Sequence, residues 1–484
     1  MAVTRTVRRT VPGTTSSTAP FPGPTGHPLL GSALDLRRDP LGTFVSAQRE
    51  HGDVVRVAAG PPGLRTVMYC VFSPEGAQQV LATQAANFRK DNVFYEEIRQ
   101  TGGNGLLTSQ DDVYLRQRRL IQPLFTKKRV DGYAATIIGE AEATAERWRN
   151  TPDVDVVREM DRLAMRTVSR VLFGADVEAA VDVIHANFPI ISAYIAGRAY
   201  SPIRLPRTWP TPSNRRAEAA TRAVYEVCDR IIAARRSNGS EAADETAGAD
   251  LLSLLSQAQN EEDGSLDATE LRDQVLVFLL AGHETTATSL AFALRLLACH
   301  PEARARAQEE IDALPPGEPY TAATVDQLPY LTQVLKETMR LYPAAPLMGR
   351  RAVAETEIDG HVIPAGADVL ISPWVTHRHP AHWDTPDRFD PDRFTPDQET
   401  ARHRYAWLPF GGGPRACIGR HFSMLESVLA LAVLLREYDI EAPATEMPVT
   451  AAVTLQAVGE ARVGVRARRR GPASKSMRQS APNG

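Results

Sequence analysis

The sequence has few cysteines and no paired cysteine motif. Its four cysteines lie at positions 70, 228, 299 and 417, and none forms a Cys-x-x-Cys pair or clusters with histidine. A structural zinc site is therefore not expected. A chain of 484 residues can bury its own core without disulfides. The default role of a cysteine here is that of a small buried hydrophobe, which fits three of the four; Cys417 lies in a glycine-rich loop instead.

Long apolar runs and a strong charge of either sign are also lacking. No run of about eighteen apolar residues occurs, so no membrane span is expected. The first twenty residues contain no apolar stretch typical of a secretory signal, and we expect a cytoplasmic protein. With 55 Lys and Arg against 58 Asp and Glu, the formal charge is −3, which gives no overall attraction to nucleic acid. An apolar fraction of 43% is ordinary for a globular protein.

The residue pattern predicts one mainly α-helical domain with minor β structure. We expect residues 21–466 to form this domain, between flexible basic tails at 1–20 and 467–484. Helical patterns dominate from about residue 73 to residue 340. The clearest individual predictions are strands at 54–58 and 66–72 around a Pro-Pro-Gly turn, helices at 133–149 and 214–236, a polar surface loop at 237–250, and short strands in the segments HVIP and DVLIS between 350 and 400.

Residues 271–300 form a long apolar segment with a polar centre. Val275 to Ala281 is uninterrupted apolar sequence, which predicts a helix in the middle of the protein. The centre then reads Gly282, His283, Glu284, Thr285, Thr286. Such residues in a core helix suggest a groove that admits a ligand, with Gly282 allowing close approach; a helix end or a satisfied polar core explains them equally well. A zinc HExxH motif is excluded, because the residue four after His283 is Ala287.

Two further segments carry charge or glycine in informative patterns. Glu337 and Arg340 share a helix face at i and i+3, a weak signal that gains interest from a further arginine, Arg393, in DRFDPDRF. The loop from Phe410 to Gly419 reads FGGGPRACIG and precedes a helical segment. A thiolate that ligates iron needs a rigid loop, backbone N–H groups near the sulfur and a helix N-terminus, and glycines allow this close approach. The glycine spacing does not fit a dinucleotide-binding loop.

These segments together resemble the cytochrome P-450 superfamily of haem-thiolate monooxygenases. FGGGPRACIG matches the family's F-x-x-G-x-R-x-C-x-G loop, AGHETT its oxygen-activation motif, KETMR its E-x-x-R motif, and PDRF the segment that completes a Glu-Arg-Arg cluster. The resemblance covers about residues 21 to 466. It implies a single fold with the haem between the long central helix and the cysteine loop, and insertion of one oxygen atom of O₂ into a substrate by hydroxylation or epoxidation.

The resemblance also implies roles for individual residues. Cys417 is similar to the axial iron ligand, and Glu284 and Thr285 to the acid–alcohol pair that supplies protons for oxygen activation. The remaining implied positions are the haem contacts Arg118, Arg350 and Arg415, Tyr114 where the family usually has Trp or His, Gly282 and Phe410 beside the cofactor, and a structural cluster of Glu337, Arg340 and Arg393. The implied cofactor is haem b, with O₂ as co-substrate and NAD(P)H acting through redox partners.

The electrons are expected from a separate protein, because the family fold uses nearly the whole chain. An acidic ferredoxin would suit a basic proximal surface, although such a run is more commonly a solvated helix face, and no fold motif supports DNA binding there. The basic residues expected in this surface are Arg116, Arg119, Lys127, Lys128 and Arg129, beside Arg415 and Arg420.

The substrate is expected to be a hydrophobic small molecule, because the segments that line the pocket in similar proteins are apolar here. A terpene, steroid, fatty acyl chain or macrocyclic polyketide would fit, and a bacterial terpenoid or polyketide secondary metabolite is favoured. Oxidative coupling or ring formation, and a non-catalytic haem sensor or carrier, remain alternatives; the pair Glu284–Thr285 speaks against the latter. The pocket residues expected are Phe94, Ile98, Leu106, Leu107, Phe188, Ile191, Leu347 and Met348, with Thr454 and Leu455 nearby.

Overall fold

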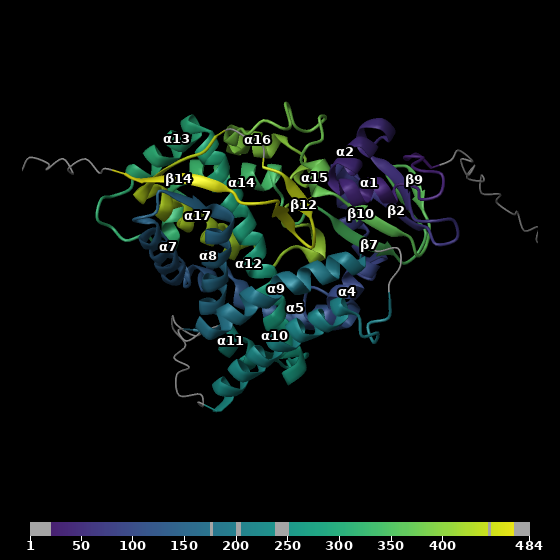
Figure 1. The fold of residues 1–484 in the computed structure, drawn as a ribbon, viewed down its shortest axis with the longest axis horizontal. Helices are drawn as coiled ribbons and strands as arrows, with labels where there is room; N and C mark the ends of the chain where they lie inside the picture. Colours follow the sequence, from purple (N-terminus) through teal and green to yellow (C-terminus); the bar gives the residue numbers. More distant parts are fainter. Residues whose placement is uncertain (1–20, 175–177, 200–204, 238–250, 444–446, 469–484) are drawn as a thin grey trace, which may run out of the picture.

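The computed structural model describes residues 21–174, 178–199, 205–237, 251–443 and 447–468, and it confirms a mainly α-helical fold with small sheets (Figure 1). The α-helices are α1 (Ala33–Arg38), α2 (Pro40–His51), α3 (Pro74–Gln78), α4 (Val93–Gly102), α5 (Asp111–Ile121), α6 (Lys127–Asp131), α7 (Ala134–Trp148), α8 (Val156–Phe173), α9 (Glu178–Ala199), α10 (Pro212–Ser237), α11 (Leu251–Gln257), α12 (Ala268–Cys299), α13 (Pro301–Asp312), α14 (Pro329–Leu341), α15 (Pro373–Thr376), α16 (Pro396–Ala401) and α17 (Arg420–Glu437).

The strands are short and form one five-stranded sheet and several smaller ones. They are β1 (Val54–Ala59), β2 (Thr66–Val71), β3 (Phe88–Arg89), β4 (Asp153–Asp155), β5 (Gln259–Asn260), β6 (Gly264–Ser265), β7 (Met348–Ala352), β8 (Thr356–Ile358), β9 (His361–Ile363), β10 (Asp368–Ile371), β11 (Tyr438–Glu441), β12 (Val449–Ala451), β13 (Leu455–Ala457) and β14 (Arg462–Ala467). The largest sheet has the order β1-β2-β10-β7-β3. Its pairs are antiparallel except β10 with β2, so residues 368–371 join the N-terminal hairpin from far along the chain.

The predicted elements agree closely with the structure where both can be compared. The strands predicted at 54–58 and 66–72 are β1 and β2, and those in HVIP and DVLIS are β9 and β10. The helices predicted at 133–149 and 214–236 are α7 and α10. The loop predicted from Ser237 falls almost wholly outside the described residues, and Ser237 itself is the last residue of α10.

The long helix α12 lies in the middle of the molecule, with α8, α14 and α17 close to it (Figure 1). It begins with a capping box in which Asp267 accepts from the Glu270 N–H and the Glu270 carboxylate accepts from the Asp267 N–H. Residues 281–286 are helical throughout, so the polar centre is not a helix end. By length and composition α12 could cross a membrane, with a mean hydropathy of 1.4 over its most apolar window, but 67% of that window is buried. It therefore has the burial of a core helix.

The C-terminal boundary of the domain lies slightly beyond the prediction. Strand β14 continues through Ala467, which pairs with Tyr438. The next residue, Arg468, contacts the Asp312 carboxylate through both terminal nitrogens, at 3.1 and 2.6 Å. Residue 467 is therefore part of a sheet rather than the start of a tail. The predicted tail segments 1–20 and 469–484 lie outside the described residues.

Candidate active site

The loop around Cys417 is held tightly by its backbone. The Cys417 N–H donates to the Phe410 carbonyl oxygen at 2.9 Å, which closes the loop just before α17 begins at Arg420. Gly413 has a φ of 62°, and a Cβ on it would lie 1.9 Å from the Leu81 carbonyl oxygen. Only glycine fits both this backbone conformation and this close approach. Phe410 packs its ring near the Arg420 guanidinium, 5.7 Å from ring centre to charge.

The Cys417 sulfur lies inside the fold but keeps an accessible surface. Burial raises the pKa of its thiol. The Gly419 N–H and the positive charges of Arg118, Lys90 and Arg420 act in the opposite direction by favouring the thiolate. The loop therefore provides the electropositive surroundings that a metal-bound thiolate needs.

Four cations gather near this loop without an acidic partner. Among the described residues, Lys90, Arg118, Arg350 and Arg415 form no ion pair with a carboxylate, and they bond to neutral oxygens instead. Arg118 donates to the Ala416 carbonyl at 3.1 Å, and Lys90 to the Leu107 carbonyl at 3.2 Å. The Nη1 atom of Arg415 is buried and has no partner.

Such a cluster needs an anion, since burial and the charges of Arg350 and Arg415 hold the pKa of Lys90 well below its ordinary value. The two carboxylates of a haem would supply the missing negative charge. The residues present therefore fit the implied cofactor. Lys90, which is only 8% exposed, was missed by sequence reasoning, because a single lysine in FRKDN has no distinctive spacing.

Tyr114 contacts both the cysteine loop and Arg415. Its hydroxyl donates to the Pro414 carbonyl oxygen at 2.6 Å, and its ring lies 3.4 Å from the Arg415 guanidinium carbon. Tyr114 therefore supports Arg415 and the loop, and its expected contact with the cofactor stays a prediction.

The centre of α12 presents its side chains in different directions. The Thr285 hydroxyl donates to the Ala281 carbonyl oxygen, one turn earlier, at 2.7 Å. Gly282 faces α8, because a Cβ there would lie 3.0 Å from Val168 Cγ2. The missing side chain thus allows α12 to pack against α8, and the expected place of Gly282 beside a cofactor stays a prediction.

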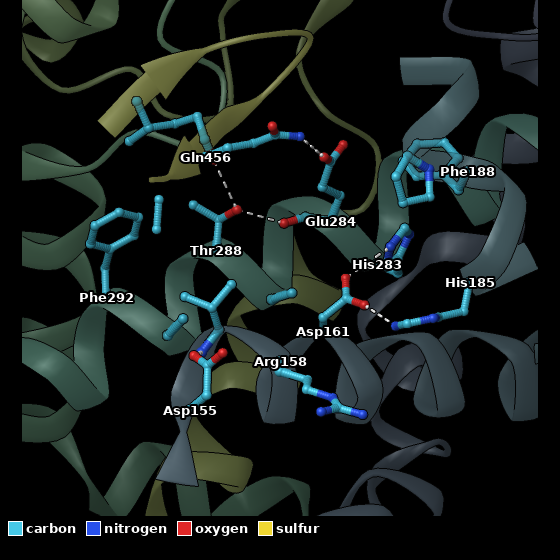
Figure 2. A pocket seen from close by; sticks show the side chains of 16 residues that line it. Asp155, Arg158, Asp161, His185, Phe188, His283, Glu284, Thr288, Phe292 and Gln456 are labelled. Atoms are coloured by element: carbon cyan, nitrogen blue, oxygen red, sulfur yellow. Dashed lines mark hydrogen bonds and ion pairs between the residues drawn. The ribbon is translucent and has the colours of Figure 1, made fainter. Parts of the chain in front are cut away.

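Glu284 faces a cavity of about 320 Å³ between α12, α8, α9 and β13 (Figure 2). Gln456 Nε2 donates to Glu284 Oε1 at 2.8 Å, whereas Glu284 Oε2 is buried without a protein partner. The Thr288 hydroxyl contacts the Leu455 carbonyl at 3.3 Å, so β13 is attached to α12 at two points. Sequence reasoning did not find Gln456, which lies 172 positions from Glu284.

The predicted cluster of Glu337, Arg340 and Arg393 is assembled in the structure. Arg340 donates to both Glu337 oxygens, at 2.7 and 2.8 Å, and neither side chain is exposed. Arg393 Nε lies 3.5 Å from Glu337 Oε1, and the Asp390 N–H donates to the same oxygen. Arg340 also donates to the carbonyls of His377, Pro386 and Arg388. The cluster thus ties α14 to the segment that leads toward the cysteine loop.

The predicted basic surface is only partly free. Arg116 pairs with Glu270 at 2.6 Å, Arg119 pairs with Asp263, and Lys127 pairs with Asp131 at 3.0 Å. Within this basic surface, the exposed cations that form no ion pair with a described residue are Lys128, Arg129 and Arg420. The surface available to a partner is therefore narrower than the sequence pattern suggested.

The predicted pocket residues belong to, or pack against, several core clusters. Ile98, Leu106 and Ile191 are buried in the cluster that includes α12 residues 275–279. Phe188 belongs to it as well, and its ring meets the His283 ring edge-on at 5.1 Å beside the cavity at Glu284. Leu107 and Phe94 pack against this cluster, Leu347 packs against a second one, and Met348 lies 3.6 Å from the position of a Cβ on Gly411.

Comparisons with known proteins agree with this site. The family model named Cytochrome P450 matches residues 21–458. Two similar proteins of Streptomyces melanosporofaciens are cyclooctatin synthase, 37% identical over 85% of this chain and 88% of the relative, and cyclooctat-9-en-7-ol 5-monooxygenase, 35% identical over 86% and 88%. Pentalenene oxygenase of Streptomyces avermitilis is 33% identical over 86% of this chain and 90% of the relative.

Comparison with solved structures points to the same family. The crystal structure of the cytochrome P450DA heme domain matches with a TM-score of 0.82 and 30% identity, covering 93% of this chain and 98% of that one. Its heme-binding fold is thus shared over nearly the full described length. By fold, by family model and by relatives above 30% identity, the chain belongs to the cytochrome P450 family and is a monooxygenase.

Proposed function

We propose that this cytochrome P450 oxygenates a terpenoid, by hydroxylation or epoxidation, in bacterial secondary metabolism. The support comes from relatives named as a monooxygenase of cyclooctat-9-en-7-ol and an oxygenase of pentalenene, which are an unsaturated alcohol and an unsaturated hydrocarbon by name. The apolar clusters that contain Ile98, Leu106 and Ile191 suit such a substrate.

The cofactor is proposed to be haem b, with Cys417 as the iron ligand. Lys90, Arg118, Arg350 and Arg415 would hold its carboxylates. Bound haem supplies the redox chemistry of O₂, and a thiolate ligand favours cleavage of the O–O bond. The protein's own task is then to exclude water, orient the substrate and deliver protons.

The structural observation that carries the proposal is the arrangement of Thr285 and Glu284. Thr285 keeps its hydroxyl on the Ala281 carbonyl, whereas Glu284 keeps one carboxylate oxygen buried and unpaired beside a cavity. A hydroxyl and a carboxyl in adjacent positions can pass protons without exposing the reaction to bulk water. A protein that only carries haem has no need for this pair.

Electrons are proposed to come from NAD(P)H through a ferredoxin that docks at Lys128, Arg129 and Arg420. These three cations remain without a recorded acidic partner among the described residues, and they lie on α6 and at the start of α17, close to the cysteine loop. Arg116, Arg119 and Lys127 contribute less, because acidic residues of the chain already pair with them. We place the protein in the cytoplasm, where such a partner is available.

The first experiment is an optical titration of the purified haem protein with terpenes, steroids, fatty acids and macrolides. We expect a saturable Soret shift with terpenes, followed by incorporation of one ¹⁸O atom from ¹⁸O₂ in turnover with a ferredoxin and its reductase. A shift confined to macrolides would refute the substrate class. A product without ¹⁸O would refute oxygenation in favour of oxidative coupling or ring formation.

Two variants test the residue roles. Cys417→Ala should abolish the thiolate-type spectrum of the carbon monoxide complex, and a normal spectrum would refute its role as ligand. Thr285→Ala should retain haem but divert electrons to peroxide, lowering product per NAD(P)H by roughly tenfold. Thr269→Ala, an exposed threonine in the first turn of the same helix α12, is the control and should leave this ratio near the parent value.

A further inference from the structure

The cavity beside Glu284 contains an acid–base group that the proposed function does not use. Asp161 of α8 lies between two histidines, and Figure 2 shows dashed contacts from its carboxylate to both. His283 Nε2 is 3.3 Å from Asp161 Oδ1, and His185 Nε2 is 3.0 Å from Asp161 Oδ2. His283 is buried, whereas the His185 side chain is 50% exposed. One carboxylate therefore connects the interior to the surface through its two oxygens.

Both ring nitrogens of His283 face oxygen atoms that accept hydrogen bonds. Nδ1 lies 3.1 Å from the Leu279 carbonyl oxygen, and Nε2 lies 3.3 Å from Asp161 Oδ1. A ring that donates at both nitrogens satisfies both contacts. The surroundings thus offer two acceptors to an imidazole one residue before Glu284.

The other charged groups of the cavity do not compete for this role. The Asp155 carboxylate accepts from the N–H groups of Val157 and Ala461 at 3.1 Å each, and Arg158 is exposed at the edge. Burial alone would raise the pKa of Asp161, but the hydrogen bonds and charges of His283 and His185 outweigh it and lower that pKa. Asp161 therefore stays anionic and keeps the transferable protons on the histidines.

We propose that His283 stores the proton that Glu284 passes on, and that Asp161 and His185 replace it from solvent. This inference rests on the proposed role of Glu284. Gln456 donates a hydrogen bond to Glu284 Oε1. The other carboxylate oxygen, Oε2, has no protein partner and can accept a proton from water in the cavity. A volume of about 320 Å³ lined by both His283 and Glu284 has room for several waters, which can bridge the two side chains.

The transfer balances without any further reactant. The Nε2 proton of His283 moves through cavity water to Glu284 Oε2, leaving a neutral imidazole and a neutral carboxylic acid. His185 takes a proton from bulk solvent and releases one to Asp161, which returns one to His283 Nε2. Asp161 begins and ends as a carboxylate, so one proton enters the protein for each proton delivered. No covalent bond other than N–H and O–H changes.

The experiment compares three variants with the parent and with a matched control. His283→Gln retains an amide donor for Asp161 but cannot release a proton. Asp161→Asn removes the negative charge between the histidines. His185→Gln removes the exposed ring that takes up protons from solvent. The control is His300→Gln at the end of α12, because His300 Nδ1 likewise faces the carbonyl four residues earlier, at 2.8 Å. Glu284→Gln serves as the reference for the acid itself.

The first readout needs no turnover. Nitrogen-15 NMR of histidine-labelled ferrous carbon monoxide complex, which is diamagnetic, should show His283 with both nitrogens protonated at neutral pH, and as a neutral ring in Asp161→Asn. The second readout is product per NAD(P)H and its solvent isotope effect. We expect His283→Gln and Asp161→Asn to lower the product ratio by roughly tenfold with an unchanged substrate-induced Soret shift, and His185→Gln to do so mainly at high pH.

The outcomes separate this inference from the function on which it rests. A neutral His283 in the parent at neutral pH would overturn the proton store. A parent-like ratio of product to NAD(P)H in His283→Gln, together with a lowered ratio in Glu284→Gln, would also overturn the proton store. It would leave the role of Glu284 intact. Full coupling in Glu284→Gln would instead refute the proposed role of Glu284. His300→Gln should match the parent in both readouts; if it were as defective as His283→Gln, the loss would reflect the helix and not the relay.

Discussion

Replacing Glu337 by glutamine tests whether the buried charge cluster stabilises the fold through its charge. The change retains the size of the side chain but leaves Arg340, which is 0% exposed, without a counter-charge. Arg340 would keep its bonds to the His377, Pro386 and Arg388 carbonyls, but a guanidinium needs an anion to offset its loss of water. Breaking a buried pair by removing one partner costs about 3–5 kcal/mol.

This cost can be measured by urea unfolding of the haem-loaded protein. Trp383, whose ring lies 4.9 Å from the Arg340 guanidinium, is a fluorescent reporter inside the cluster. With an m-value of about 3 kcal/mol per M or somewhat more, the midpoint should fall by roughly 1 M. The matched control is Glu399→Gln, which breaks a partly exposed pair with Lys336, the neighbour of Glu337 on α14.

The control should shift the midpoint by no more than about 0.3 M, because an exposed pair is worth under about 1 kcal/mol. Equal shifts in Glu337→Gln and Glu399→Gln would refute the reasoning. They would show that packing and backbone bonds hold this segment, and that the buried charge contributes nothing beyond a surface pair.

Three further predictions follow from the contacts above. Lys90→Met should speed haem transfer to apomyoglobin by roughly ten- to a hundredfold, the loss of one charge-assisted bond, without destabilising the haem-free protein. Asp53→Asn should lower stability by up to about 1 kcal/mol at pH 7. The hydrogen bond from His379 depresses the pKa of Asp53, so its stabilisation exists above the unfolded pKa and is lost as the pH falls through the folded one. Gly282→Ala should place a methyl group too close to Val168, which lowers the free energy of unfolding by about 1–3 kcal/mol, while the better helix propensity of alanine restores about 1 kcal/mol. Val168→Ala should relieve the clash.

Each of these has its own check. Unchanged haem retention in the Lys90 variant would show that this cation does not contact the cofactor. A loss of stability in Asp53→Asn that is the same at pH 7 and at low pH would exclude the charge of the carboxylate as its cause. In the Gly282 and Val168 double-mutant cycle, purely additive unfolding free energies would contradict the close packing of α12 on α8.

The local part of the site could be read from the sequence. Glu337 and Arg340 are one turn apart, so any helix there places them on one face, and the structure pairs them at 2.7 and 2.8 Å. The glycines of the cysteine loop predicted a close approach of the backbone, and Gly413 has both a positive φ and a contact with the Leu81 carbonyl that leaves no room for a Cβ. Strands β1 and β2 followed from alternation and a turn signal close together in the chain.

The contacts that the sequence did not predict all join segments that are distant in the chain. The close packing of Gly282 on Val168 of α8 was not foreseen, because which helix faces a glycine on an apolar helix depends on the tertiary packing. Arg116 and Arg119 looked like free docking cations, yet the hairpin of β5 and β6 and the start of α12 bring Asp263 and Glu270 to them. Periodicity contains no information about such partners, because they lie more than a hundred residues away.

The sequence by itself therefore determined the family and the mainly helical class, and it proposed the cysteine, acid and alcohol of the site, because each motif consists of residues within a few positions of one another. Only the tertiary structure decided that Lys90 joins the arginines, that Gln456 holds one oxygen of Glu284, and that Asp161 links His283 to His185. The last two pairings arise from the packing of α8, α9 and β13 around α12, whereas Lys90 reaches the arginines from the segment between β3 and α4. The physical reason is that burial forces each charged or polar group to find whichever partner the packing brings within reach.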